Sequence, residues 1–566
     1  MIRYRNISVA LAINAIFLAL CLSIHHLRFA AIDDYFMAGI LSGVYGNEYN
    51  VHLPFVNAIY AYCLLPLYHL FPKICWYYIG ELVSVFISLT CIAFLLIKIV
   101  GIRWGVVFGT LFVAVCAKDL YVTVQFTLCA EILSATGMLM FLFGFNLVSK
   151  ERQSKKNAVP FVVCGILMLW WGSFMRWEAF LMGLPFFALA LLFCLKRFWF
   201  FRNYVILALV IFGIGIVGLH LFNQSLYTDL SYKQYVDFQP FRVLLGDGSF
   251  YNENAIYEDL QEMGASPKDF DLLKKWFFYD NEVFAPDSVK IYEKLIRKYT
   301  ATSSSGVLPI MLLRCLEHVA YTPIFFIWVV FCVVLVCSNK QGNLFLWISL
   351  AIVLGMYTYL LDVNRIVYRV EFGLFFYVTV LSIVFWGRLR TISRKIVFFL
   401  VAGILLVSSY MYYETKAFFR NPNDGRLVAM QKMLDRKGYD QLFSYMESVP
   451  DSVLFVVPMD TYMDLTEYRS PPYLNEPMGS WQRIIPTGFW TPYYPDVETS
   501  FRQRGMTNPM KDIVNDNVYF VSDIKFGTSL VDFLQRHHFD SVAVDTVRRF
   551  SDVYLLKYRV VESEGR

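Results

Sequence analysis

The sequence predicts an α-helical multi-pass membrane protein, with about 11 spans, that ends in a small C-terminal α/β domain. Its 566 residues are 57% hydrophobic and 18% aromatic, with a mean hydropathy of +0.49, which exceeds the apolar content of a soluble globular chain. The apolar residues form runs of the length that a spanning helix needs, about 20 residues. After residue 413 charged residues and prolines become more frequent. These observations predict a transmembrane module over 1–413 and a soluble domain over 414–566.

Basic residues decide which apolar runs cross the membrane. The run 55–72 is expected to be interfacial or re-entrant, because Pro54, Pro66 and Pro72 interrupt it. All basic clusters then fall on one side, which is expected to be cytoplasmic. The predicted spans are 7–26, 75–97, 104–118, 126–148, 158–175, 178–195, 204–222, 318–337, 343–361, 367–386 and 396–413.

This topology places the N-terminus in the cytoplasm and the loops 27–74 and 223–317 outside, together with the C-terminal domain. The expected location is a bacterial cell inner membrane with the C-terminal domain in the periplasm, and an endoplasmic reticulum membrane stays open. The long loop shows helical patterning over 268–278 and 288–298.

The C-terminal segment alternates short β-like runs at 453–457, 518–521 and 553–556 with helical stretches at 427–434 and 529–536. A loop rich in proline and aromatic residues, 484–495, lies between them. Such a loop can line a groove or stack on a sugar ring, and it can equally serve packing alone. The 11 cysteines show no paired CxxC spacing, so neither a metal site nor a disulfide framework is predicted.

Two adjacent carboxylates, Asp33 and Asp34, follow the first predicted span directly. A carboxylate at the membrane edge loses hydration, which tends to raise its pKa and favours proton transfer or cation binding. The simpler alternative is that Asp33 caps a following helix, since Asp is a favoured N-cap residue. Both interpretations remain open, because one Asp can cap while the other acts in chemistry.

The arrangement resembles the GT-C superfamily of membrane glycosyltransferases, which includes protein O-mannosyltransferases and lipid A aminoarabinose transferases. These enzymes carry a catalytic acid in the first external loop, then partly embedded juxtamembrane helices and a second polar loop. Asp33 and Asp34 match the first-loop acid, 55–72 resembles a juxtamembrane helix, and 118–127 takes the second-loop position.

The second loop departs from that pattern. Many relatives carry an acid there, where this chain has Gln125, Phe126 and Thr127, and its candidate acids are Asp119 and Glu131. We therefore expect chemistry without a metal or another cofactor, and a divalent metal is not excluded.

The resemblance implies that a sugar moves from a polyprenyl-phosphate carrier to an extracytoplasmic acceptor, a hexosyltransferase reaction that inverts the anomeric centre. Asp33 or Asp34 would be the general base, with Asp34 preferred if Asp33 caps the helix. The leaving phosphate needs fixed cations, and the planar fork of Arg suits it. The candidate substrate-binding residues are Arg176, Glu178, Arg365, Arg369, Asp119 and Gln125.

Simpler roles exist for several of these residues. Arg176 can pair only with Glu178, and Arg369 only with Glu371 or Asp362. Asp119 beside Lys118 reads as a surface ion pair.

The expected partners are a polyprenyl-phosphate-linked sugar donor, a protein, lipid or glycan acceptor, and membrane lipid, with no nucleic acid. The competing functions are a transporter or flippase of lipid-linked sugars, a polymerase or ligase of surface polysaccharide, and a non-catalytic scaffold. A transporter would show internal repeats and charges near the bilayer midplane, whereas the strong charges here lie at the ends of predicted spans.

Overall fold

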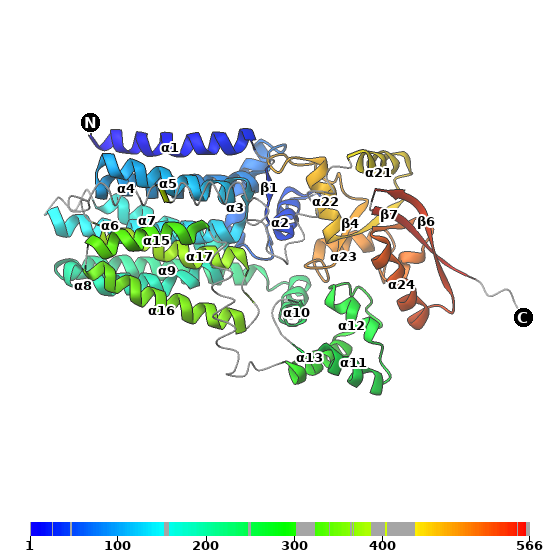
Figure 1. Cartoon of the computed structure of the whole chain (residues 1–566). Coiled ribbons are helices and arrows are strands. Elements are labelled where there is room, and N and C mark those ends of the chain that lie inside the picture. Colours follow the sequence, from blue (N-terminus) through cyan, green and yellow to red (C-terminus); the bar gives the residue numbers. More distant parts are fainter. Residues whose placement is uncertain are drawn as a thin grey trace, which may run out of the picture.

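The computed structural model describes residues 2–24, 27–45, 48–151, 158–246, 251–300, 323–338, 340–362, 365, 367–386, 402–403, 436–551 and 553–561. Long, nearly parallel helices form a bundle, and a β-sheet lies beyond one end of it (Figure 1). We call this the sheet end of the bundle.

The bundle contains the predicted spans. Among the described residues, eight helices are long and apolar enough to cross a membrane, and the apolar helices α7 and α15 are shorter. Ten of the eleven predicted spans fall on these helices, and 396–413 lies almost entirely outside the described residues. The helices are α1 (Ile2–Ile24), α4 (Trp76–Val100), α5 (Ile102–Tyr121), α6 (Phe126–Glu151), α7 (Val159–Met175), α8 (Trp177–Phe198), α9 (Arg202–Leu226), α15 (Pro323–Ser338), α16 (Lys340–Asp362) and α17 (Tyr368–Ser382), with short 3-10 turns η2 (Trp199–Phe201) and η4 (Ile383–Phe385).

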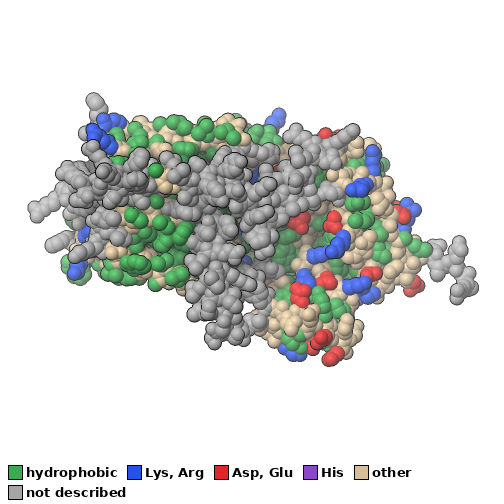
Figure 2. Space-filling model, in the orientation of Figure 1, with side chains coloured by type: hydrophobic (Ala, Val, Ile, Leu, Met, Phe, Trp, Pro, Cys, Tyr) green, Lys and Arg blue, Asp and Glu red, His purple; other side chains and the backbone are tan. Residues whose placement is uncertain are grey.

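The chain is therefore a multi-pass membrane protein. On the face shown in Figure 2, hydrophobic side chains predominate on the visible described part of the bundle, whereas charged side chains of both signs are scattered over the part that carries the sheet. Basic side chains also lie at the far end of the bundle, which is the pattern expected of a cytoplasmic end.

Helix α3 (Ala58–Leu70) does not cross the bundle. The Asn57 N–H just before it donates to the Phe174 carbonyl at 2.8 Å, and the Lys73 carbonyl just after it accepts from the Asn475 N–H at 2.9 Å. Both ends of α3 therefore lie at the sheet end, as the prolines in 55–72 predicted.

Small residues let two of the spans approach closely. Gly137 of α6 faces Gly165 of α7, and a Cβ added to either would lie 2.8 Å from the carbonyl oxygen of the other. Polar side chains tie other spans together: Asn14 of α1 donates to Thr90 of α4 at 2.9 Å and accepts from Tyr121 of α5 at 2.7 Å. Both devices are typical of helix packing in membranes.

Two short strands join the first and second loops of the sheet end. Strand β1 (Arg28–Phe29) pairs in parallel with β2 (Thr123–Val124). Helix α2 (Ile32–Ser42) follows β1, and α6 follows β2. This pairing brings the first turns of α2 and α6 side by side.

The C-terminal part contains a five-stranded sheet with the order β4-β3-β5-β7-β6. Strands β3, β4 and β5 are parallel, and β7 runs antiparallel to β5 and β6. The three predicted strands and the helix at 529–536 are confirmed, whereas 427–434 lies outside the described residues. The elements are α21 (Arg436–Ser448), β3 (Leu454–Pro458), α22 (Met459–Arg469), β4 (Ile484–Thr487), α23 (Pro495–Arg502), η5 (Asp512–Val514), β5 (Val518–Ser522), α24 (Ile524–His537), β6 (Val542–Phe550) and β7 (Val553–Val560).

In the described part of the chain between α9 and α15, helices pack beside the sheet: α10 (Leu230–Gly246), α11 (Glu253–Glu262), α12 (Pro267–Lys274) and α13 (Pro286–Tyr299). Helix α13 confirms the helical stretch predicted at 288–298, and α12 confirms the one predicted at 268–278 as far as Lys274, where the helix ends. Acidic residues attach this segment to the sheet, since Asp269 pairs with Arg536 and His537, and Asp280 pairs with His538.

Candidate active site

Asp33 and Asp34 lie in the first turn of α2, but neither caps it. The N-cap position is Ala31, which makes no side-chain hydrogen bond to the helix. The extended backbone of β1 continues through Ala31, so helical geometry begins at Ile32, one residue before the carboxylates. The interpretation of Asp33 as the helix cap is wrong. The preference for Asp34 as the general base depended on that interpretation and is no longer supported by it.

Asp34 joins three elements in the protein interior. Its side chain is 0% exposed, and Oδ1 accepts from the Tyr77 hydroxyl of α4 at 3.1 Å and from the Phe126 N–H at 3.3 Å. Because Phe126 is the first residue of α6, the Asp34 carboxyl occupies that helix's N-terminus, where a negative group is favoured. Burial, and then the charge of Asp33, raise the pKa of Asp34 to about 8.

A second carboxyl, that of Glu81, lies close to Asp34. Glu81 sits one turn after Tyr77 on α4, is 0% exposed, and is electrostatically coupled to Asp34. Such an enclosed pair suits a structural or proton-holding role better than contact with a substrate.

Asp33 faces the other way. It is partly exposed and accepts a hydrogen bond from the indole Nε1–H of Trp490, in the loop after β4. Asp33 also lies near enough to Arg176 and Tyr235 for its negative charge to influence the ionisation of both side chains. Of the two carboxylates, only Asp33 is open to a reactant.

Arg176 lies at the junction of α7 and α8. Its Nε is 2.9 Å from Glu178 Oε2, and its guanidinium lies 5.1 Å from the ring centroid of Phe55 and 5.5 Å from that of Phe126. Burial lowers the pKa of Arg176, while the charges of Glu178 and Asp33 raise it. The predicted pair with Glu178 is present, and the same guanidinium also belongs to a wider cluster.

That cluster includes the two other predicted arginines. Arg365 and Arg369 both act electrostatically on Arg176. Arg369 occupies the first turn of α17 and also acts on Glu131 of α6. The Glu131 carboxyl is fully buried, and its oxygens make no hydrogen bond within the described part of the chain. It lies against Gly373, where any Cβ would clash with it.

Asp119 and Gln125 are both buried. Asp119 is 7% exposed and accepts a hydrogen bond from the Tyr368 hydroxyl, so its predicted surface position is wrong, although the charge of Lys118 still acts on it. The helix α5 extends through Tyr121, and Asp119 turns inward on its last turn. Gln125 is also buried, and its carbonyl accepts from the Cys129 N–H at 3.0 Å. The structure thus brings Asp33, Arg176, Glu178, Arg365 and Arg369 within electrostatic reach of one another, whereas Asp34, Asp119 and Gln125 are buried and make their hydrogen bonds to other residues.

Sequence reasoning missed three residues of this site. The Cζ atom of Arg242 lies 3.1 Å from the ring centroid of Trp490. Tyr235 is buried, and the charges of both Asp33 and Arg242 act on its hydroxyl. Trp490 lies in the predicted proline and aromatic loop, so its neighbourhood carried a signal. Arg242 and Tyr235 carried none, because only the tertiary fold brings α10 to α2.

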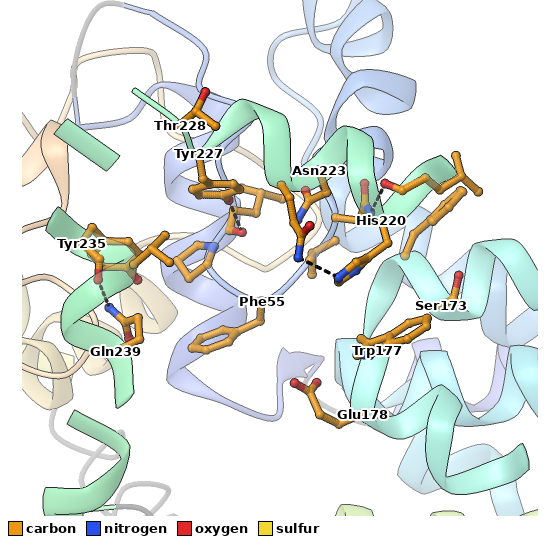
Figure 3. Close-up of a pocket in the computed structure, with 18 of the residues that line it drawn as sticks. Phe55, Ser173, Trp177, Glu178, His220, Asn223, Tyr227, Thr228, Tyr235 and Gln239 are labelled. Atoms are coloured by element: carbon orange, nitrogen blue, oxygen red, sulfur yellow. Dashed lines mark hydrogen bonds between the residues drawn. The ribbon is translucent and has the colours of Figure 1, made fainter. Parts of the chain in front are cut away.

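A cleft of about 760 Å³ opens beside these residues. It lies between the segment 53–57, the first turn of α8, the end of α9 and α10. In Figure 3, Phe55 lies between Tyr235 of α10 and Glu178 of α8, with His220 and Asn223 of α9 above it. Most of its lining is apolar or aromatic, as is usual for sites that bind organic ligands.

Within the described ranges, no group of three or more His, Cys, Asp or Glu side chains is placed to hold a metal ion. The independence of the chemistry from metals stays a prediction.

No protein-family model and no curated protein matches the sequence. The chain is similar to the solved apo oligosaccharyltransferase of Archaeoglobus fulgidus, with 11% identity over 94% of this chain and 71% of that one, and a TM-score of 0.40. It is also similar to ArnT from Cupriavidus metallidurans, solved with undecaprenyl phosphate (11% identity, 99% of both chains, TM-score 0.40) and in the apo state (12% identity, 97% of both chains, TM-score 0.40).

Proposed function

We propose that this protein is a membrane glycosyltransferase that moves a sugar from a polyprenyl-phosphate carrier to a hydroxyl-bearing acceptor on the sheet side of the membrane. The observation that supports it best is one partly open carboxylate, Asp33, beside a cluster of three arginines at the end of a membrane bundle. A base and fixed cations are the two groups that this reaction requires.

Asp33 is the proposed general base. The acceptor O–H gives its proton to the Asp33 carboxylate as the acceptor oxygen bonds to C1 of the sugar. The bond between C1 and the phosphate oxygen breaks, and its electron pair leaves with the polyprenyl phosphate. A single displacement of this kind inverts the anomeric centre.

The arginines are the proposed phosphate site. Negative charge develops on the departing phosphate, and cations already fixed in place stabilise it without reorganisation. Arg176 is held by Glu178 and by the rings of Phe55 and Phe126. Arg369 interacts electrostatically with Arg176 and with the buried Glu131. These two interactions support a fixed position for its charge.

The cleft beside Phe55, Glu178 and Tyr235 is the proposed path by which a reactant reaches Asp33. Its apolar lining suits an isoprenoid chain or the apolar part of an acceptor. The proposed orientation is a cytoplasmic N-terminus and a periplasmic sheet in a bacterial inner membrane, and it follows from the basic residues at the far end of the bundle.

Mass analysis of surface glycans and of polyprenyl-linked sugars tests this proposal. Cells that lack the protein should accumulate one polyprenyl-linked sugar and lose that sugar from a surface glycan. The wild-type chain and the control Arg103→Gln, at the end of the bundle remote from the site, should restore both, whereas Asp33→Asn and Arg369→Gln should not. Unchanged glycans and carrier lipids on removal of the protein would overturn the proposal.

A further inference from the structure

The loop that follows β4 carries one residue of the sheet into the candidate active site. Strand β4 lies at the edge of the sheet and ends at Thr487. Three residues later, the indole Nε1–H of Trp490 donates to Oδ1 of Asp33. The separation in sequence between these two residues is 457 positions, so the contact joins the C-terminal sheet to the first loop of the membrane bundle.

The Trp490 ring is enclosed by residues from other elements. The Arg242 guanidinium lies 3.1 Å from its centroid, the Phe55 ring meets it edge-on at 4.2 Å, and the Trp276 ring lies 6.0 Å away. Trp490 is only 7% exposed. The direction of its N–H is therefore fixed by packing and by a cation over its face.

The backbone around Trp490 adopts conformations that bulky residues rarely adopt. Phe489 has φ of 52°, Tyr493 has φ of 61°, and Trp276, which contacts Phe489 at 4.7 Å, has φ of 53°. Positive φ is unfavourable for aromatic residues, and such strain persists where the surroundings over-determine it, commonly at functional sites. Three of the four non-glycine residues with positive φ in the described chain meet here.

Both sides of the loop are anchored. The Gly488 N–H donates to the Tyr279 hydroxyl at 2.6 Å, which ties the loop to the segment after α12. The Tyr494 hydroxyl donates to the His52 carbonyl at 2.9 Å, and Asn50 Nδ2 donates to Asp496 at 2.9 Å. These bonds tie the other side to the first loop of the bundle and hold Trp490 between them.

We propose that Trp490 is a positioning residue for the transfer reaction: its indole N–H orients the Asp33 carboxylate toward the acceptor, so that the docked sheet is part of the active site. This inference rests on the proposed function of Asp33. One N–H bond to Oδ1 fixes the orientation of the carboxylate and leaves Oδ2 open to an acceptor hydroxyl.

The test compares Trp490→Phe with the matched control Trp481→Phe. Trp481 is 1% exposed in the same part of the chain, and its Nε1 makes no hydrogen bond within the described residues. Both variants lose the same atoms from a buried site. The assay adds purified protein to membranes of cells that lack it, because these membranes hold the native donor and acceptor.

In Trp490→Phe we expect the maximal rate to fall about tenfold or more, with little change in the concentration of membranes that gives half the maximal rate. Trp481→Phe should show no such fall in the maximal rate, even if both variants have the same lowered Tm.

Trp490→His separates the N–H donor from the aromatic ring. Its ring nitrogen can replace the indole N–H, so it should recover a substantial part of the rate that Trp490→Phe loses. Equal maximal rates in Trp490→Phe and Trp481→Phe, or no gain from histidine, would overturn the positioning role. A wild-type protein without transfer activity would instead overturn the proposed function itself.

Discussion

Two neighbouring carboxylates in one helical turn have different environments and therefore different properties. Asp34 points inward to Tyr77 and the start of α6, whereas Asp33 points to Trp490 and Arg176. In a helix, successive residues are separated by about 100° around the axis, so one turn of α2 can serve both the interior and the site. The different environments of Asp33 and Asp34 follow from that geometry.

The raised pKa of Asp34 predicts a dependence of stability on pH. Its pKa rises from 3.8 to about 8 on folding, so the folded chain keeps a proton that the unfolded chain has lost between these values. Wild-type stability should therefore fall as pH rises through this range, by on the order of 1 kcal/mol per pH unit. Asp34→Asn, which mimics the protonated carboxyl, removes this contribution.

Thermal unfolding of the purified protein at pH 5 and pH 8 measures the effect. The Tm of Asp34→Asn relative to wild type should increase between these two values. The exposed Asp451→Asn serves as control and should show no such trend. A constant difference between Asp34→Asn and wild type would contradict the assigned environment of Asp34.

The sequence located the residues of the site better than it assigned their environments. Asp33 and Asp34 were evident because carboxylates follow an apolar span directly. Asp119 was wrongly placed on the surface because its neighbour Lys118 offered a simple partner, while its hydrogen-bond partner Tyr368 is 249 positions away. Glu81 did carry a signal that was not used, since a lone acid inside a span is costly and commonly functional.

At the scale of elements, the bundle depends on close approach between α6 and α7. Gly165→Ala should destabilise the protein by about 1–3 kcal/mol, because the new methyl group must push α7 away from the carbonyl of Gly137. Gly213→Ala on α9 is the matched control, since nothing lies within 4 Å of its Cβ position. It should be neutral or stabilising by up to about 1 kcal/mol.

Thermal unfolding in the same detergent compares the two alanine variants. A Tm for Gly165→Ala equal to that of Gly213→Ala would show that the two helices are not in such close contact.

The elements themselves were largely predictable. The positions of ten spans followed from runs of apolar residues, and the non-spanning character of α3 followed from its prolines. The extension of α5 past residue 118 was not predicted, because charge near the end of an apolar run reads as a loop although the helix continues to Tyr121.

At the scale of the whole molecule, the site needs three parts of the chain held together: the bundle, the helices α10–α13 and the sheet. Asp280 is a principal tie between the last two. It is 0% exposed, pairs with His538, and accepts from Asn508 Nδ2 at 2.9 Å. None of these long-range partners could be read from sequence, since each lies more than two hundred positions from Asp280.

Asp280→Ala should loosen the helices α11–α13 from the sheet, because it leaves a buried polar partner unpaired at a cost of about 3 kcal/mol. Limited proteolysis should cleave 251–300 faster in this variant than in wild type. Asp287→Ala, on the exposed surface of α13, should leave the cleavage rate unchanged. Equal rates in the two variants would contradict the role of Asp280 as a tie.

The central claim is that Asp33 takes the acceptor proton while Asp34 holds the fold. It is tested most directly by the rate of sugar transfer when purified Asp33→Asn and Asp34→Asn are added, at equal amounts of folded protein, to membranes of cells that lack the chain. We predict that Asp33→Asn lowers the rate by about 10²- to 10⁴-fold, whereas Asp34→Asn keeps most of it. Undiminished transfer by Asp33→Asn, or a larger loss in Asp34→Asn, would contradict the claim.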